Sequence, residues 1–280
     1  MTDTRAGSGK LYVVATPIGN LSDLSPRARA VLEQADVIAA EDTRRTRGLL
    51  SPIVAESRLI AYHEHNETER VAQLLERLEQ GHSIALVSDA GTPLISDPGW
   101  RLVSAARAAG FTVVPIPGAC AALAALSAAG LPTDHFVFEG FLPRRAAARA
   151  ERLEALRTEQ RTIVFYEAVH RVVETLAAMR EAFGAERRAA IARELTKAHE
   201  QIVTGSLAEL EPQLGADIPL LGEFVLIVAG AAAVAPDEAA AQRVYALLAA
   251  ELDATVALRL TSAITGVSRN ALYRLVRTRE

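Results

Sequence analysis

The chain has 280 residues, of which 50% are hydrophobic and 23% are charged, with a formal net charge of −4. This is the composition of an ordinary globular protein, and it excludes a disordered chain. A single cysteine, Cys120, excludes a disulfide framework and a zinc site built from cysteines. No apolar run is long enough to span a membrane, and the polar first ten residues lack the apolar core of a signal peptide, so we expect a cytoplasmic protein.

Strand and helix patterns alternate through the first 118 residues. Ser25 followed by Pro26 predicts one helix start, and the capping-box spacing of Asn66 and Glu69 predicts another. Strands that alternate with helices are typical of βαβ units and predict a mainly parallel sheet. The predicted strands are residues 11–15, 37–40, 58–62, 83–87 and 111–115.

A second group of strand patterns follows an alanine-rich helix that ends at Gly130. Helical stretches lie between only some of these strands, which predicts a mixed sheet in a second α/β lobe. The strands are residues 136–141, 161–167, 187–194, 200–205 and 223–230.

The last segment is predicted to be helical and contains a helix–glycine turn–helix pattern. Asn270, Arg274 and Arg277 share one face of its final helix, and Leu272, Leu275 and Val276 share the other. We therefore expect three domains, which are residues 1–118, 119–232 and 233–280.

Loops rich in proline and glycine follow three of the predicted strands, and they are TPIGN (16–20), DAGTPLISDPG (89–99) and IPGAC (116–120). Ligands of open α/β sheets bind outside the carboxyl ends of the strands, where such loops would converge. Asp89 is suited to a cationic or hydroxylated group, and Gly91 would let the backbone approach a ligand closely. The alternative, a set of tight turns that only cap the sheet, stays open on composition alone.

Several other motifs are weak individually. His63 and His65 stand two residues apart, which suits opposite sides of a strand better than one set of metal ligands, so we expect no metal. A Walker A lysine, a nucleophile elbow and a G-x-G-x-x-G fingerprint after the first strand are missing, which argues against an ordinary nicotinamide or flavin enzyme. Glu41 and Asp42 end the second strand, where a helix cap with a surface ion pair is the alternative interpretation.

Arginines cluster in residues 42–47, 142–152 and 268–279. Basic patches on a mildly acidic protein can bind a polyanion locally, and solvated surface charge is the alternative for each patch taken alone.

A series of motifs stands in order between Leu11 and Gly230: LYVVATPIGNLSDLSPRA, AAEDTRRT, HEHNE, ALVSDAGTPLISDPG, IPGACA, LSAAGLP, FEGFLPR, FYEAVHR, ARELTK and GEFVLIV. Together they resemble the bacterial 16S ribosomal RNA 2′-O-ribose methyltransferases, within the tetrapyrrole-methylase class of S-adenosylmethionine-dependent enzymes. The resemblance implies a two-lobed α/β fold (class III methyltransferase) with a mainly parallel N-terminal sheet, a mixed C-terminal sheet and a small helical tail.

The resemblance also implies an activity and partners. S-adenosylmethionine would donate a methyl group to the ribose 2′-oxygen of a decoding-centre cytidine in 16S rRNA of the small ribosomal subunit. The enzyme would be a homodimer without a metal or a membrane partner. The alternatives are a methyltransferase of the same class that acts on a small molecule such as a tetrapyrrole precursor, and a non-catalytic RNA-binding protein of ribosome assembly.

Site residues follow from the same resemblance. The expected cofactor-binding residues are Pro17, Ile18, Asp89, Gly91, Thr92, Leu94, Ile95, Ala119, Cys120, Ala121, Tyr166, Leu195, Glu223 and Phe224. A base or orienting group is expected among Glu41, Asp42 and His63, because a ribose hydroxyl must lose its proton. The expected RNA-binding residues are Arg44, Asn66, Arg144, Arg145, Arg269 and Arg274.

Two positions depart from the family pattern. Ala119 stands where the family usually has a second proline, which leaves the rigidity of that loop open. The segment 254–263 has one arginine where the family is rich in lysine, so RNA binding by the tail would depend on the arginines that follow.

Overall fold

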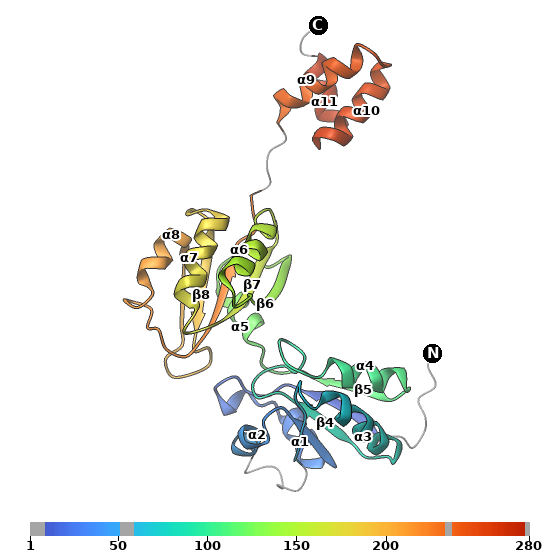
Figure 1. The fold of residues 1–280 in the computed structure, drawn as a ribbon, viewed down its shortest axis with the longest axis vertical. Coiled ribbons are helices and arrows are strands. Elements are labelled where there is room, and N and C mark those ends of the chain that lie inside the picture. Colours follow the sequence, from blue (N-terminus) through green and yellow to red (C-terminus); the bar gives the residue numbers. More distant parts are fainter. Residues whose placement is uncertain (1–8, 51–58, 233–236, 278–280) are drawn as a thin grey trace. The chain divides into compact units, whose positions relative to one another are not determined.

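The computed structural model describes residues 9–50, 59–232 and 237–277. The chain forms two compact units, Met1–Ala231 and Ala232–Glu280, and each is considered by itself. Figure 1 shows the helices and strands with their labels. Among the described residues, every helix is too short or too polar to cross a lipid bilayer.

The first sheet of the larger unit is entirely parallel, as the alternating pattern predicts, with strand order β3-β2-β4-β1-β5. Its strands are β1 (Lys10–Val14), β2 (Val37–Ala40), β3 (Leu59–Ala61), β4 (Ile84–Val87) and β5 (Thr112–Ile116). The central strands β2 and β4 are buried along their whole length, which is typical of a parallel sheet covered on both faces.

Helices cover both faces of this sheet (Figure 1). Side chains of α3 and α4 join one buried cluster with the sheet, and side chains of α1 join another on the opposite face. The helical elements of this lobe are η1 (Leu21–Asp23), α1 (Pro26–Gln34), α2 (Thr43–Leu50), α3 (Glu67–Glu79) and α4 (Trp100–Ala108).

Both predicted helix starts are confirmed, but only one has the predicted side-chain cap. The Ser25 side chain accepts the Ala28 N–H at 3.1 Å and caps α1. Asn66 precedes α3 without a side-chain capping bond. Its side-chain oxygen accepts the His63 N–H at 2.9 Å and its amide nitrogen donates to the Ala61 carbonyl at 3.1 Å, so the amide group is turned back toward the preceding turn.

The start of α4 is held by a side chain from a different helix. Gly99, with φ of 136°, precedes α4 and donates its N–H to Oε1 of Glu67 at 3.3 Å. The buried Tyr62 hydroxyl donates to the same oxygen at 2.8 Å, and Arg101 Nε lies 3.1 Å from Oε2. Glu67 thus fixes the point at which the connection from Val87, the last residue of β4, to Gly99 (the 87–99 loop) enters α4.

The second sheet of the larger unit is mixed, as predicted, with strand order β6-β7-β10-β8-β9. Only β6 and β7 pair in parallel among the described strands of this sheet, and the other pairs are antiparallel. Its strands are β6 (Phe136–Phe141), β7 (Thr162–Ala168), β8 (Arg188–Arg193), β9 (Gln201–Ser206) and β10 (Glu223–Val228).

The two faces of the second sheet bury different clusters. Side chains of α6, α7 and α8 pack on one face, and α5 packs on the other (Figure 1). Successive side chains of β7 alternate accordingly, with Phe165 toward α7 and Val164 and Tyr166 toward α5. The helical elements are α5 (Ala121–Ala128), α6 (Ala146–Ala155), α7 (Val172–Phe183), α8 (Leu207–Leu210) and η3 (Glu211–Gln213).

The smaller unit is helical, as predicted, and consists of α9 (Glu238–Ala249), α10 (Ala254–Thr265) and α11 (Arg269–Arg277). Gly266, with φ of 71°, ends α10, and the Ser268 side chain accepts the Ala271 N–H at 3.2 Å as α11 begins. Leu272 is buried while Asn270 and Arg274 are exposed, in agreement with the predicted faces of α11. The side chain of Arg277 lies outside the described residues.

Candidate active site

The larger unit contains a cavity of about 490 Å³ whose walls come from both of its sheets. Its volume lies within the usual range for a small-molecule site. Most of the predicted cofactor residues line it, and they are Ile18, Asp89, Gly91, Thr92, Ile95, Cys120, Ala121, Tyr166, Leu195, Glu223 and Phe224. Loops at the carboxyl ends of β1, β2 and β4 thus converge as the position of such loops in an α/β sheet predicts.

The other predicted cofactor residues, Pro17, Leu94 and Ala119, do not line the cavity. Pro17 is buried, and Leu94 packs against the core of the first sheet. The Ala119 carbonyl accepts the Thr92 hydroxyl at 3.0 Å, which joins the 87–99 loop to the segment before α5. These three residues therefore support the loops that line the cavity and do not line it themselves.

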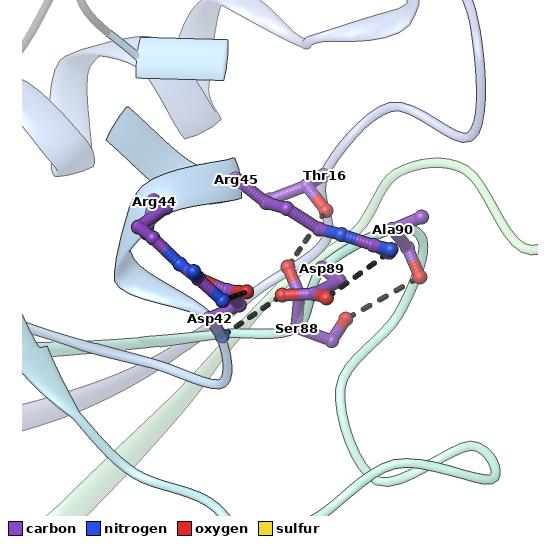
Figure 2. A network of polar contacts seen from close by, with 7 residues as sticks. All are labelled: Thr16, Asp42, Arg44, Arg45, Ser88, Asp89 and Ala90. Atoms are coloured by element: carbon purple, nitrogen blue, oxygen red, sulfur yellow. Dashed lines mark hydrogen bonds and ion pairs between the residues drawn. The ribbon is translucent and has the colours of Figure 1, made fainter. Parts of the chain in front are cut away.

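The 16–20 loop and the 87–99 loop are joined through their backbones. The Thr16 N–H donates to the Gly91 carbonyl at 2.8 Å, and the Gly91 N–H donates to the Thr16 carbonyl at 3.0 Å. The Thr16 hydroxyl also donates to the Ser88 carbonyl at 3.3 Å (Figure 2). Gly91 has φ of 87°, a conformation that favours glycine, and a Cβ there would lie 3.3 Å from Cγ2 of Ile18.

Backbone strain is concentrated on the two walls of the cavity. Ile95 lies between Leu94, with φ of 74°, and Ser96, with φ of 63°. In the second lobe Leu195 lies between Glu194 and Thr196, whose φ angles are 51° and 66°. The four flanking residues are the only non-glycine residues with positive φ in the described part of the chain. Such conformations cost about 1–3 kcal/mol each and gather at functional sites, where surrounding contacts hold them.

Three of the acidic residues that line the cavity, Glu41, Asp89 and Asp97, lie close enough to repel one another. Burial, together with repulsion by Glu41 and Asp89, raises the pKa of Asp97 to about 7. Burial and the nearby Asp89 also raise the pKa of Glu41 above its usual value. Asp97 is therefore a carboxyl group that can take up or release a proton near neutral pH.

Asp89 connects the cavity to the start of α2 (Figure 2). Its Oδ1 accepts the Asp42 N–H at 2.9 Å, and its Oδ2 lies 3.3 Å from Nη1 of Arg45. The carboxylate of Asp42 instead accepts the Arg44 N–H at 2.8 Å and pairs with the Arg44 guanidinium at 3.1 Å. These hydrogen bonds from Arg44 lower the pKa of Asp42 to about 2, which makes its carboxylate a weak proton acceptor.

His63 and Asn66 lie together in the turn between β3 and α3, and neither lines the cavity. The amide nitrogen of Asn66 is 3.3 Å from Nε2 of His63. The prediction that His63 and His65 point to opposite sides of a strand is wrong, because the turn brings their rings edge to face with centroids 6.0 Å apart. The described residues contain no group of three or more metal-ligating side chains placed to hold an ion.

The predicted RNA-binding arginines divide between the units. Arg144 and Arg145 are exposed in the loop that follows β6, whose last residue, Phe141, lines the cavity. Arg269 and Arg274 are exposed on α11 of the smaller unit.

Sequence reasoning missed several cavity residues, and three of them enter the argument below: Arg45, Asp97 and Phe141. Arg45 and Asp97 stand inside motifs already singled out, AEDTRRT and SDAGTPLISDPG, and Phe141 stands in FEGFLPR. Their presence in these motifs was the available signal, but no pattern in the sequence distinguishes them from their neighbours.

Comparison with known proteins identifies the family. The model of the tetrapyrrole (corrin/porphyrin) methylases matches residues 10–211, and that of the RsmI C-terminal HTH domain matches residues 235–277. A curated protein of Pseudomonas aeruginosa named ribosomal RNA small subunit methyltransferase I is 53% identical, over 95% of this chain and 96% of its own. The protein of the same name from Escherichia coli O157:H7 is 49% identical, over 95% and 94%.

Solved structures agree on the fold. Uroporphyrin-III-C-methyltransferase from Thermus thermophilus is 25% identical, with a TM-score of 0.55 over 79% of this chain and 94% of that one. A diphthine synthase, 16% identical with a TM-score of 0.61 over 79% and 90%, is similar in fold alone. The chain therefore belongs to the tetrapyrrole methylase family and, within it, to the group whose curated members are named ribosomal RNA small subunit methyltransferase I.

Proposed function

We propose that this protein uses S-adenosylmethionine to methylate the ribose 2′-oxygen of a decoding-centre cytidine in 16S rRNA of the small ribosomal subunit. The names of its relatives support methylation of small-subunit ribosomal RNA. The observation that carries the choice of atom is Asp97, a carboxyl group with a pKa of about 7 on the cavity wall. A ribose hydroxyl must lose its proton as its oxygen is methylated, and a carboxyl group of this pKa can accept that proton.

The cavity residues fit S-adenosylmethionine. Apolar side chains of Ile18, Ile95 and Leu195 suit the two faces of an adenine ring. Carboxylates suit ribose hydroxyls, the ammonium group and the positive sulfonium, and Asp89 and Glu223 line the cavity. When bound, the cofactor supplies an electrophilic methyl group.

Catalysis by this chain then consists of orientation and proton removal. The rigid loops around Gly91 and Thr92 position the reactants, which supplies most of the rate enhancement in a reaction of this kind. Asp97 accepts the proton of the 2′-hydroxyl as the oxygen attacks, and a base of this pKa is largely ionised at slightly alkaline pH. Glu41 assists by keeping the pKa of Asp97 high.

The RNA would bind through exposed arginines of both units. Arg144 and Arg145 adjoin the cavity wall, and Arg269 and Arg274 lie on α11. Phosphate contacts of this kind release counterions, so binding of the small subunit should weaken steeply with salt. We further propose a cytoplasmic homodimer, as the resemblance implies, which sedimentation of the purified protein would test.

The decisive experiment is methyl transfer from labelled S-adenosylmethionine to small ribosomal subunits that lack the modification. A 2′-O-methyl group blocks alkaline cleavage of the next phosphodiester, so one resistant linkage in the decoding region is expected. Label on a base, without a resistant linkage, would refute the proposed atom. If cofactor binds but RNA takes up no label, the substrate is a small molecule or the protein is non-catalytic, and tetrapyrrole precursors would be assayed next.

A further inference from the structure

Strand β6 contains an irregularity directly before its last residue. Phe138 is paired with Val164 of β7, but Gly140 is paired with the next residue, Phe165, and Phe141 with Tyr166. One extra residue is thus inserted in β6, and Gly140 adopts φ of 68° at this bulge. Bulges are common on edge strands next to functional sites, where they redirect a side chain, and β6 is an edge strand.

The bulge decides on which face of the sheet Phe141 lies. Paired residues of neighbouring strands share a face, so regular pairing after Phe138 would place Phe141 opposite Glu167. Glu167 is buried on the α7 side, where its Oε2 accepts the Thr175 hydroxyl at 2.6 Å. The extra residue instead places Phe141 beside Tyr166, on the face that lines the cavity.

Phe141 is exposed at the place to which the bulge moves it. Its side chain lines the cavity, yet the residue is 56% exposed. The Phe141 ring contacts the Tyr166 ring edge to face, with the ring centroids 5.7 Å apart and the ring planes at 64°. A large aromatic ring that is held at a cavity mouth and is open to solvent is suited to stacking with a flat partner.

The backbone on both sides of Phe141 is fixed. Before it, Glu139 forms a bidentate pair with Arg152 of α6, with distances of 2.6 and 2.8 Å to Nη2. After it, Nη2 of Arg171 donates to the Leu142 carbonyl at 2.9 Å and to the Pro143 carbonyl at 3.1 Å. The segment that carries the ring therefore needs little ordering when a ligand binds, which favours affinity.

We propose that Phe141 is a stacking platform for an unpaired nucleobase of the RNA substrate at the mouth of the cavity. Proteins that read single-stranded RNA stack splayed bases on aromatic side chains beside basic groups that hold the phosphates. Phe141 is followed after two residues by the exposed Arg144 and Arg145, so both components lie on one fixed loop. This inference rests on the proposed function, because it names the RNA contact of that site.

The test compares Phe141→Ala, Phe141→Leu and Phe141→Trp in the full-length protein. Phe136→Ala is the matched control, because Phe136 begins the same strand, is 40% exposed and does not line the cavity. The readouts are KM and kcat for unmethylated small subunits, and the S-adenosylmethionine Kd by calorimetry. Leucine keeps the apolar character but loses the ring face, and tryptophan keeps a ring.

Loss of one base stack is expected to raise KM for the small subunit about 5- to 150-fold in Phe141→Ala and Phe141→Leu. Phe141→Trp and Phe136→Ala should stay within about twofold of the original protein, and the cofactor Kd should hardly change in any variant. If the KM of Phe141→Leu for the small subunit equals that of the original protein, the stacking role is overturned.

Two other outcomes would also overturn it. A cofactor Kd that rises as much as KM would place Phe141 in the cofactor wall, and dissociation of a dimer in Phe141→Ala would make it a subunit contact. Failure of the proposed function is separate, because the unmodified protein would then leave small-subunit RNA unlabelled before any variant is compared.

Discussion

The two walls of the cavity share an unusual backbone conformation, but different contacts support it on each wall. In the first lobe Ile95 lies between two residues of positive φ, and in the second lobe Leu195 does the same. The 87–99 loop of the first lobe is held by backbone bonds between Gly91 and Thr16 and by the buried carboxylate of Glu67. The strain around Ile95 is therefore supported from the protein interior.

Acidic side chains and a lysine support the second wall at the surface. The Thr196 N–H donates to Oε2 of Glu200 at 2.6 Å, and Lys197 Nζ pairs with Glu194 at 2.8 Å and with Glu223 at 3.1 Å. The Glu223 side chain is 77% exposed, so water and salt weaken this pair. The interior-supported wall carries Asp89 and Asp97, to which the proposed proton transfer is assigned, whereas the other wall carries Leu195 and the exposed Glu223.

The largest effect is expected from Asp97→Asn, which removes the proposed base and leaves the shape of the loop. We expect the single-turnover rate to fall by about 10²- to 10⁴-fold. In the original protein the rate should rise with pH through about 7, because Asp97 accepts a proton only once it is ionised. The measurement is the rate of methyl transfer from about pH 5.5 to 8.5, at saturating cofactor.

Glu41→Gln is the companion variant. Removing the negative charge beside Asp97 lowers the pKa of Asp97, so the rise in rate should move to lower pH. An Asp97→Asn protein of undiminished rate, combined with a large loss in Glu41→Gln, would transfer the role of base to Glu41.

The next largest effect is expected from Glu67→Ala, which removes the internal support of the first wall. The Tyr62 hydroxyl and the Gly99 N–H would lose their acceptor, and the free energy of unfolding should fall by about 2–3 kcal/mol. Glu67→Gln keeps an acceptor oxygen, so its free energy of unfolding should fall much less. Urea denaturation of both variants measures the difference, and equal losses would contradict the role assigned to Oε1.

Shortening the two aliphatic side chains compares the walls directly. Ile95→Ala and Leu195→Ala should each raise the cofactor Kd by about 5- to 30-fold, from lost apolar contact. Leu195 is 7% exposed without any ligand and Ile95 is 37% exposed, so only Leu195→Ala should also lower the free energy of unfolding, by about 2–4 kcal/mol. Calorimetry gives the first quantity and urea denaturation the second. A destabilised Ile95→Ala would show that the walls do not differ in this way.

The smallest effect is expected at Lys197, in the support of the second wall. Lys197→Gln removes both ion pairs, which are partly exposed, so the cofactor Kd should rise only about two- to threefold at low salt. At about 1 M salt the original protein and the variant should bind equally, because screening weakens the pairs in the original protein. A Kd ratio that does not change with salt would mean that Lys197 acts through packing.

The sequence predicts the elements of the molecule better than it predicts their details. Alternating strand and helix patterns are local, so both sheets and the convergence of their loops follow from them. The high pKa of Asp97 depends on its burial and on the negative charge of Glu41 at the end of a different strand, and a single sequence records neither.

Two other features differ from what the sequence pattern alone predicts, and both have local causes. The spacing of Asn66 and Glu69 is that of a capping box, yet the Asn66 side chain finds partners in the turn before it. The face of Phe141 follows from counting residues along β6 only if the bulge at Gly140 is known, because one extra residue reverses the assignment.

The small core of the C-terminal unit has a consequence for heating experiments. Its buried hydrophobic cluster consists of Ala241, Val267 and Leu272, with Leu258, Ala271 and Leu275 partly buried against it. A unit of this size buries little apolar surface, whereas the larger unit has several extensive clusters. Scanning calorimetry should therefore resolve a first, broad endotherm of low enthalpy for the C-terminal unit, followed by a sharp one for the rest of the chain.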